Sequence, residues 1–353
     1  MDLLKGIRII DFTRLLPGPV TTHMLAQMGA TVIKIESPKR TDFVREGPSQ
    51  IEGVSVLFHQ LNHNKQLISI DYNTPEGRLE VLKLIKTADI LVEQFRPGVM
   101  DAWELGYTHV KAVNPEIVYA SISGYGKDNA LASAAGHDIN YLAYSGLLSL
   151  LKDETGKPNV PAAQIADVSG SYAAAIAIQG ALIKRLKTKQ GSYLDIALCD
   201  AVLPLLSLPY SLYSSGLDHK KVNLFNGINA TNYMVYQCAD QRWLAVGALE
   251  MKFWNTFCEL VEKPEWKRKN FLELFGDYFP RQEVIALFKT KTSEAWLKLV
   301  EGHDTCISQI LELEALEEFP YHKDRGTFET FTTAGGHELK TISLPFRVVP
   351  ESS

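Results

Sequence analysis

The feature that most constrains the fold is a strand–turn–helix–strand pattern that begins near the N-terminus. The β-branched run at 6–13 (GIRIIDFT) predicts a buried strand. The Pro-Gly-Pro turn at 17–19 predicts a helix that begins near Pro19 and ends at Gly29, and the run at 31–36 (TVIKIE) predicts a second strand. Two strands joined by a helix within about thirty residues form a βαβ unit, so the sheet is predicted to be parallel.

The same pattern recurs over the first 200 residues. Strands are expected at 66–72, 88–95, 116–126 and 191–198, with helices at 75–87, near 99–113 and at 168–188. This alternation is typical of a doubly wound α/β domain, in which ligands bind at the carboxyl ends of the strands. We therefore predict a Rossmann-like large domain over residues 1–200.

The alternation stops after residue 200. Residues 203–221 are rich in Pro, Ser and Tyr, which indicates a connecting segment, and we take 201–225 as a linker. A pair of strands within 232–249 and a helical pattern over 251–300 follow. These patterns predict a second, smaller α+β domain over 226–315.

The composition of the chain excludes several classes of protein. The 353 residues are 46% hydrophobic and 22% charged, which is ordinary for a globular protein. The net charge of −5 gives no electrostatic case for nucleic-acid binding. We expect no signal peptide, no membrane-spanning run and a cytoplasmic location, with the four scattered cysteines buried and reduced.

The sheet lacks the nucleotide-binding fingerprints that such a fold often carries. DFTRLLPGP stands where GxGxxG would follow the first strand, and there is no P-loop, which disfavours a nicotinamide dehydrogenase. Cationic and amide side chains instead lie at the ends of several predicted strands. Lys34, Lys39 and Arg40 lie around the end of the second strand, Asn64 and Lys65 precede the third, and Arg96 follows the fourth. Such groups suit a polyphosphorylated ligand, although each could also be a solvated surface charge. Arg96 is the strongest candidate because the QFRPG turn fixes it.

Three ionisable residues stand in apolar surroundings. His137 lies in AGHDINY, Asp167 in QIADVSGSY and Glu250 in VGALEMKFW. Taken alone, they could be a core histidine, a helix N-cap and a surface carboxylate at a strand end. Asp138 could orient His137 or another neighbour.

Together these segments resemble the class III CoA-transferase (CaiB/BaiF) family, which includes the α-methylacyl-CoA racemases. The resemblance covers almost the whole chain. It runs through the segments at 6–36, 62–78, 90–107, 114–126, 191–198 and 314–329. It implies a large domain completed by about residues 316–353, and an interlocked homodimer in which each chain threads through the other.

Within the family, three segments are most similar to the racemases. AGHDINYLAYSG resembles the racemase segment with the catalytic histidine, and DVSG places Asp167 at 30 residues beyond His137. VGALE resembles the segment whose glutamate, here Glu250, supports the histidine from the small domain of the other subunit. The resemblance thus implies a racemase or epimerase of 2-methylacyl-CoA thioesters, with His137 and Asp167 on the two faces of the α-carbon. Asp138 then becomes a local hydrogen-bonding group.

The resemblance also implies the residues that bind the substrate. Coenzyme A and the acyl group are expected at Arg14, Arg40, Asn64, Lys65, Glu93, Arg96, Gly124, Tyr125, Lys127 and Tyr141. No metal and no cofactor beyond the coenzyme A of the substrate are implied, and the partners expected are the acyl-CoA and a second copy of the chain, with no nucleic acid and no membrane. A helix beginning just after Asp167 would offer backbone N–H groups to the thioester oxygen.

Two other functions stay open. In an acyl-CoA:carboxylate CoA-transferase, Asp167 would be a nucleophile that passes through a mixed anhydride and an aspartyl-CoA thioester. A non-catalytic acyl-CoA-binding protein is the third possibility, and the presence of His137, Asp167 and Glu250 argues against it.

Overall fold

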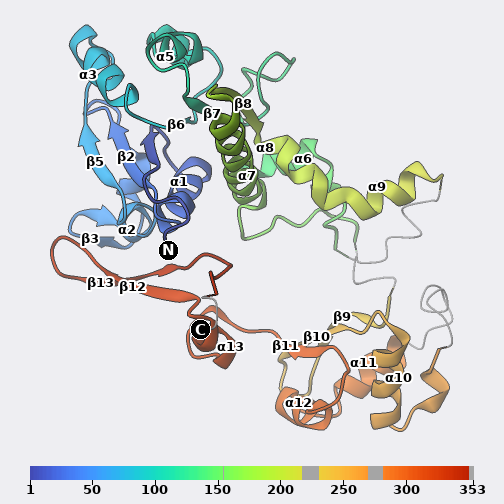
Figure 1. The fold of residues 1–353 in the computed structure, drawn as a ribbon. Coiled ribbons are helices and arrows are strands. Elements are labelled where there is room, and N and C mark those ends of the chain that lie inside the picture. Colours follow the sequence, from blue (N-terminus) through green and yellow to red (C-terminus); the bar gives the residue numbers. More distant parts are fainter. Residues whose placement is uncertain (154, 217–229, 269–280, 350–353) are drawn as a thin grey trace. The chain divides into compact units, whose positions relative to one another are not determined.

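The computed structural model describes residues 1–353 except 154, 217–229, 269–280 and 350–353. The chain divides into two compact units (Figure 1). Unit 1 comprises residues 1–148, 160–204 and 317–353, and unit 2 comprises residues 149–159 and 205–316. Compared with the predicted domains, unit 2 gains residues 149–159, and part of the predicted linker at 201–225 lies outside the described residues.

Unit 1 is built on a six-stranded parallel sheet of order β5-β2-β1-β6-β7-β8. Its strands are β1 (Arg8–Asp11), β2 (Thr31–Glu36), β5 (Gln66–Ser69), β6 (Ile90–Glu93), β7 (Val118–Ser123) and β8 (Ser192–Ala197). The predicted Rossmann-like α/β fold class is confirmed. The strand β2 has the predicted bounds, whereas the other five strands are shorter than their predicted runs, because those runs extend beyond the paired residues.

Helices bury both faces of this sheet. The helices of unit 1 are α1 (Pro17–Gln27), α2 (Val56–Asn62), α3 (Pro75–Ile85), α4 (Val99–Ala102), α5 (Tyr107–Val113), α6 (Asp138–Tyr144), α7 (Ile165–Thr188), α8 (Leu198–Val202) and α13 (Pro320–Arg325). Ile9 of β1 packs in one apolar cluster with residues of α1, α6 and α7, whereas Ile10 packs in a second with residues of α3, α4 and α5. Successive strand residues therefore meet helices on opposite faces, which explains the nearly continuous apolar runs.

One predicted helix is interrupted. The segment expected as a helix near 99–113 forms α4 and α5, separated at 103–106. Glu104 has φ +56, a left-handed conformation that ends α4. Gly106, the N-cap of α5, sits against the Asp101 side chain, where an added Cβ would approach Oδ1 to 1.8 Å.

By length and composition alone, the helix α7 is long and apolar enough to cross a membrane, whereas no membrane-spanning run was expected from the sequence. Half of its most apolar window is buried. Ala174 and Ile178 of α7 belong to the apolar cluster that also contains Leu25 of α1 and Met28, the C-cap of α1. These contacts make α7 a core helix of unit 1.

Smaller elements complete unit 1. They are β3 (Gln50–Ile51), β4 (Val54–Ser55), η1 (Phe43–Glu46) and the antiparallel pair β12 (Phe328–Thr332) and β13 (Glu338–Ile342). Two short helices, η2 (Leu147–Ser149) and η3 (Leu203–Leu206), include residues of both units. The β12–β13 hairpin docks on unit 1 through the side-chain amides of Gln27 and Gln60, which donate to backbone carbonyls of β13. Phe331 also stacks on His63, with 4.0 Å between ring centroids.

Unit 2 has a three-stranded antiparallel sheet of order β11-β10-β9. Its elements are α9 (Ser207–Ser214), β9 (Tyr233–Gln237), β10 (Trp243–Gly247), α10 (Met251–Leu260), η4 (Pro264–Trp266), α11 (Arg281–Phe288), α12 (Ser293–Val300), β11 (Ile307–Gln309) and η6 (Leu313–Ala315). The core is aromatic, with Trp254, Phe257 and Trp296 buried together. The short strand β11 and the helix α9 were not predicted, and Cys306, expected to be buried, is exposed.

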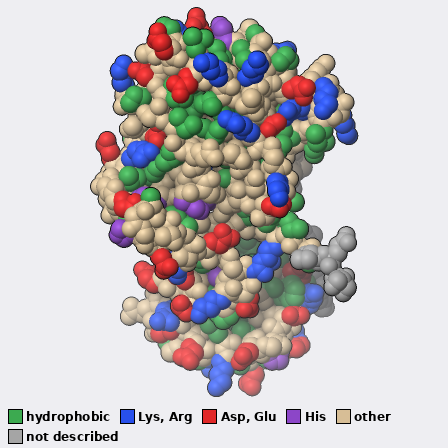
Figure 2. Space-filling view, turned by 60° about the vertical axis from the view of Figure 1, so that its left-hand side comes forward, with side chains coloured by type: hydrophobic (Ala, Val, Ile, Leu, Met, Phe, Trp, Pro, Cys, Tyr) green, Lys and Arg blue, Asp and Glu red, His purple; other side chains and the backbone are tan. Residues whose placement is uncertain are grey.

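Surface charge is mixed on the face of the molecule in Figure 2. Acidic and basic side chains are interspersed there, and neither sign forms a continuous field. This distribution agrees with the net charge of −5.

Candidate active site

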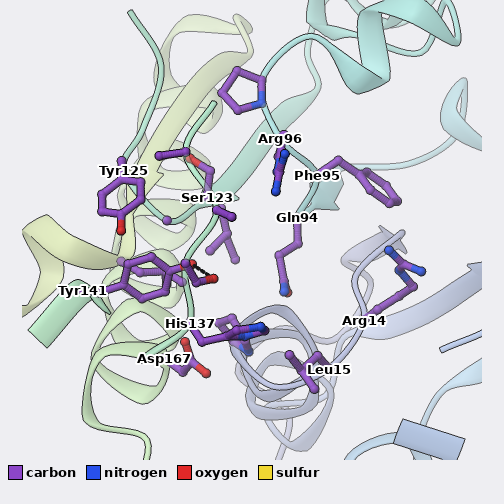
Figure 3. Close-up of a pocket in the computed structure, with 18 of the residues that line it drawn as sticks. Arg14, Leu15, Gln94, Phe95, Arg96, Ser123, Tyr125, His137, Tyr141 and Asp167 are labelled. Carbon is purple, nitrogen blue, oxygen red and sulfur yellow. Dashed lines mark hydrogen bonds between the residues drawn. The ribbon is translucent and has the colours of Figure 1, made fainter. Parts of the chain in front are cut away.

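A cavity of about 430 Å³ lies in unit 1 beyond the carboxyl ends of the central strands (Figure 3). This is the edge at which doubly wound sheets bind ligands. Eight of the predicted site residues line it: Arg14, Arg40, Arg96, Gly124, Tyr125, His137, Tyr141 and Asp167. They come from loops after β1, β2, β6 and β7, from α6 and from the first turn of α7.

His137 and Asp167 enter the cavity from the N-terminal ends of two helices. His137 is the exposed N-cap of α6, and Asp167 lies in the first turn of α7 with 8% of its surface exposed. The Asp167 backbone N–H donates to Oδ1 of Asp138 (3.0 Å), so the residue after His137 ties α6 to α7. Asn140 Oδ1 accepts from the His137 backbone N–H (3.1 Å). These contacts hold both backbones in place.

The surroundings of Asp167 suit proton exchange near neutral pH. Burial and, to a smaller extent, the negative charge of Asp138 together raise the pKa of Asp167 to about 6. A group exchanges protons most effectively when its pKa lies near the working pH. Asp138 makes the local hydrogen bond that was predicted for it, and it also raises the proton affinity of Asp167.

Tyr141 forms part of the wall rather than offering a free hydroxyl. Its phenol donates to the Gly136 carbonyl (2.7 Å), and burial followed by the charge of Asp167 raises its pKa to about 12. A Cβ on Gly124 would come within 2.5 Å of the Tyr141 ring, and one on Gly136 within 2.9 Å. Both glycines are therefore needed to seat the ring, which packs edge-on against Tyr125 at 5.2 Å.

Another side of the cavity is cationic, because Arg14, Arg40 and Arg96 line it. The guanidinium carbons of Arg14 and Arg40 lie 5.5 and 5.6 Å from the centroid of the Phe95 ring. Burial and then the charge of Arg40 lower the pKa of Arg14. Within the described part of the chain, neither residue forms an ion pair, and neither does Arg96. Three guanidinium groups without a carboxylate partner make this side suitable for an anion such as a phosphate.

Two residues predicted to bind coenzyme A lie outside this cavity. Lys65 has a fully buried ammonium that donates to Asp11 Oδ2 (3.2 Å), Thr22 Oγ1 (2.7 Å) and the Pro19 carbonyl (3.1 Å). Its three donors are thus used inside the protein. The side-chain oxygen of Asn64 lies 3.2 Å from Nδ1 of His23. The positive charge of Lys65 compensates the buried carboxylate of Asp11, which the position of Lys65 just before the predicted strand at 66–72 did not reveal.

Two further predicted residues, Glu93 and Lys127, line a second cavity of about 380 Å³. Arg96 and Pro97 form a wall common to both cavities. Glu93 is buried and accepts from the Phe95 backbone N–H (2.7 Å), and burial raises its pKa to about 7 against the opposing effect of a hydrogen bond from Ser121. Glu93 therefore shapes the turn that carries Phe95.

Two other expectations concern the backbone at Asp167 and the role of Glu250; the structure contradicts the first and does not test the second. The helix that carries Asp167 begins at Ile165, and the Asp167 and Val168 N–H groups donate to Asp138 Oδ1 and the Gln164 carbonyl. The prediction that a helix starting just after Asp167 presents free N–H groups there is therefore wrong. Glu250 is the exposed N-cap of α10 in unit 2, and its support of His137 stays a prediction.

Several cavity residues were missed. Leu15, Phe43, Gln94 and Phe95 line the cavity, and Gln94 Oε1 accepts from the Gly18 backbone N–H (2.8 Å). Their position beside Arg14 and Arg96 at predicted strand ends was the available signal. Across the described residues, no group of three His, Cys, Asp or Glu side chains is arranged to hold a metal ion.

Comparison with known proteins identifies the family of this chain. Residues 4–352 match the model of CoA-transferase family III. The human alpha-methylacyl-CoA racemase is 30% identical over 333 residues, which cover 93% of this chain and 82% of the racemase. The human succinyl-CoA:glutarate CoA-transferase is 31% identical over 310 residues, which cover 85% of this chain and 69% of the transferase.

A solved structure extends the likeness to the fold. A CAIB/BAIF family protein from Brucella suis superimposes with a TM-score of 0.82 at 26% identity, covering 99% of this chain and 93% of the other. The family match, the relatives and the fold point to the same group of enzymes. The chain belongs to CoA-transferase family III, whose members among its relatives include both CoA-transferases and a racemase.

Proposed function

We propose that this enzyme is a racemase or epimerase of 2-methylacyl-CoA thioesters that works by two-base proton transfer. The observation that carries the proposal is that His137 and Asp167 line one cavity from different helices. A racemase must remove the α-hydrogen from one face of the carbon and return a proton to the other. A single side chain cannot reach both faces, so two acid–base groups are required.

The proposed reaction is balanced within the substrate and the two side chains. One of the two groups takes the α-proton, and the C–H electron pair moves into an enolate on the thioester oxygen. The other group then gives a proton to the opposite face of the α-carbon. The Asp167 pKa of about 6 supports this role, because both protonation states are accessible near neutral pH.

The charge distribution in the cavity suggests how the substrate lies. The phosphates of coenzyme A would face Arg14 and Arg40, and the thioester would face His137 and Asp167. The acyl chain would then lie near small and apolar residues, which include Ala132, Ala134, Ala135, Ile122 and Leu198. The proposed reaction needs no cofactor besides the coenzyme A that is part of the substrate.

We also infer a homodimer. Along α7, Tyr172, Ile176 and Ile183 are 45%, 70% and 57% exposed, and their spacing puts them on one face of the helix. An exposed apolar helix face of this kind supports association with a second copy. In that dimer, Glu250 of one chain would support His137 of the other, as the resemblance implies. A cytoplasmic location remains part of the proposal.

The alternative is a CoA-transferase in which Asp167 is the nucleophile. The succinyl-CoA:glutarate CoA-transferases among the relatives favour it, since they match as well as the racemases. In this reaction the Asp167 carboxylate would attack the thioester carbonyl and expel the CoA thiolate, giving a mixed anhydride. The thiolate would then attack the Asp167 carbonyl of the anhydride, releasing the donor carboxylate and leaving an aspartyl-CoA thioester.

Variants separate the two functions. We expect His137→Ala to abolish racemisation of a 2-methylacyl-CoA, measured by chiral analysis, and to abolish exchange of the α-hydrogen in the enantiomer that His137 deprotonates, measured by NMR in deuterated water. A transferase that uses only Asp167 would keep its turnover in the same variant, measured as transfer of CoA from succinyl-CoA to an added carboxylate. Hydroxylamine trapping of Asp167 in the wild type, together with acceptor-dependent CoA transfer, would overturn the racemase proposal. The exposed His303 supplies a control, and His303→Ala should leave exchange unchanged.

A further inference from the structure

The loop between β1 and α1 forms one wall of the cavity in an unusual conformation. Arg14 and Leu15 of this loop and Pro17, the first residue of α1, line the cavity. Leu15 has φ +63, in the left-handed region that non-glycine residues seldom adopt. A left-handed residue persists only where its surroundings hold it there. The contacts that hold this loop are therefore part of how the cavity is made.

One buried ion pair holds the loop on both sides of Arg14. Asp42 Oδ1 accepts from the Leu15 backbone N–H (3.0 Å), and Asp42 Oδ2 lies 3.2 Å from the Lys34 ammonium. The same ammonium donates to the Thr13 carbonyl (2.5 Å). The side chains of Lys34 and Asp42 are 0% and 1% exposed. The pair thus holds the backbone immediately before and after Arg14.

A second buried pair, Asp11 and Lys65, holds the beginning of the loop and the first turn of α1 that follows it. Asp11 Oδ1 accepts from the Thr13 backbone N–H (2.8 Å), and the Lys65 ammonium donates to the Pro19 carbonyl (3.1 Å). Asp11 and Lys65 are joined at 3.2 Å, and both side chains are fully buried. Two lysines and two aspartates therefore contact the backbone of the segment 13–19, which comprises part of the loop and the first residues of α1.

Buried ion pairs of this kind add little stability compared with apolar packing, because removing the charges from water offsets their attraction. Here the charged groups are directed at backbone N–H and carbonyl groups of the loop, and they define its conformation. We propose that Asp42–Lys34 and Asp11–Lys65 are positioning residues that hold Arg14 and Leu15 in the wall of the coenzyme A site. Lys65 then acts through the loop and does not touch the substrate. The inference rests on the proposed binding of coenzyme A in this cavity.

The proposal predicts a specific effect on binding. If the loop loses its anchor, Leu15 leaves the left-handed region and the binding-competent conformation is only partly populated. The apparent Kd rises by the inverse of that population. The intrinsic free-energy penalty for a non-glycine residue in the left-handed region corresponds to about a fivefold to thirtyfold decrease in the population of that conformation. The KM for an acyl-CoA should rise by a similar factor, whereas kcat at saturation should change less than about twofold.

The test is a calorimetric titration with coenzyme A. Asp42→Ala combined with Lys34→Met removes the anchor without leaving one buried charge unpaired. We expect this double variant to raise the Kd about tenfold when residue 15 is leucine, and much less in a Leu15→Gly background, because glycine adopts positive φ freely. The exposed pair Asp2 and Lys5, replaced by alanine and methionine, is the matched control and should leave the Kd unchanged.

The outcomes are distinguishable. Equal changes of Kd in the two backgrounds, or no change in either, would overturn the inference. If wild-type protein does not bind coenzyme A, the proposed function fails instead. If the double variant does not fold by circular dichroism, Leu15→Val and Leu15→Asn decide the question, since valine disfavours the left-handed region and asparagine tolerates it. A higher Kd for valine than for asparagine supports the proposal, and equal values contradict it.

Discussion

Replacing Asp138 by asparagine tests how the site tunes Asp167. In the wild-type protein, the Asp167 backbone N–H donates a hydrogen bond to Asp138 Oδ1 (3.0 Å). Asparagine keeps a side-chain oxygen that can accept this hydrogen bond, but it removes the negative charge. Loss of that charge makes ionisation of Asp167 easier, so its pKa falls. The pKa of Asp167 stands at about 6 against a reference of 3.8, with burial the larger cause and Asp138 the smaller. Since the charge accounts for less than half of this difference, we expect a fall of about one unit at most.

The assay is the pH dependence of kcat/KM for α-hydrogen exchange, measured separately from each enantiomer of a 2-methylacyl-CoA. Asp167 must be deprotonated when it is the base and protonated when it is the acid. Lowering its pKa therefore moves the acidic limb to lower pH for one enantiomer and the basic limb to lower pH for the other. Asp128→Asn, at an exposed carboxylate, is the control and should move neither limb. An unchanged profile in Asp138→Asn, or a shift to higher pH, would refute the reasoning.

Three further predictions concern the cavity walls. Gly124→Ala should lower the free energy of unfolding by about 1–3 kcal/mol, measured in urea, and reduce α-hydrogen exchange, because the new Cβ would meet the Tyr141 ring at 2.5 Å. The control is Gly180→Ala on α7, where the Cβ would enter open space, and it should not lower the stability. Arg40→Met should weaken coenzyme A binding by about tenfold and flatten its salt dependence, as measured by titration at two ionic strengths; an unchanged Kd would place the phosphates elsewhere. Tyr141→Phe should leave the pH profile in place while lowering stability by about 1 kcal/mol, through loss of the hydrogen bond to Gly136.

Most of unit 1 could be predicted from the sequence, because the sequence signals for its strands and helices are local and repeated. Apolar runs such as 6–13 and 31–36, separated by a Pro-Gly-Pro turn and a glycine, specify strands and a helix without knowledge of distant contacts. The strand β11 was not predicted because its Ile-Ser-Gln sequence is three residues long and is defined by pairing with β10. The helix α9 contains a proline and several serines, which on their own favour a turn.

The candidate site shows the same division. Arg96 could be selected because it follows a predicted strand, and His137 and Asp167 because they are ionisable residues in apolar segments that resemble motifs of the family. Lys65 was misjudged because nothing near it in the sequence reveals a buried partner 54 residues away at Asp11. The role of Asp42 was invisible for the same reason, since its contact with Leu15 spans 27 residues. Long-range compensation of buried charge is a property of the folded chain.

The central claim, two-base proton transfer at the α-carbon, is tested most directly by incubating the enzyme with one enantiomer of a 2-methylacyl-CoA in deuterated water without any carboxylate acceptor. Mass spectrometry and chiral analysis then follow the label and the configuration at C2 together. The account predicts that one deuterium enters C2 while optical purity falls. Retention of hydrogen and configuration at C2, with CoA transferred only once an acceptor is added, would contradict it.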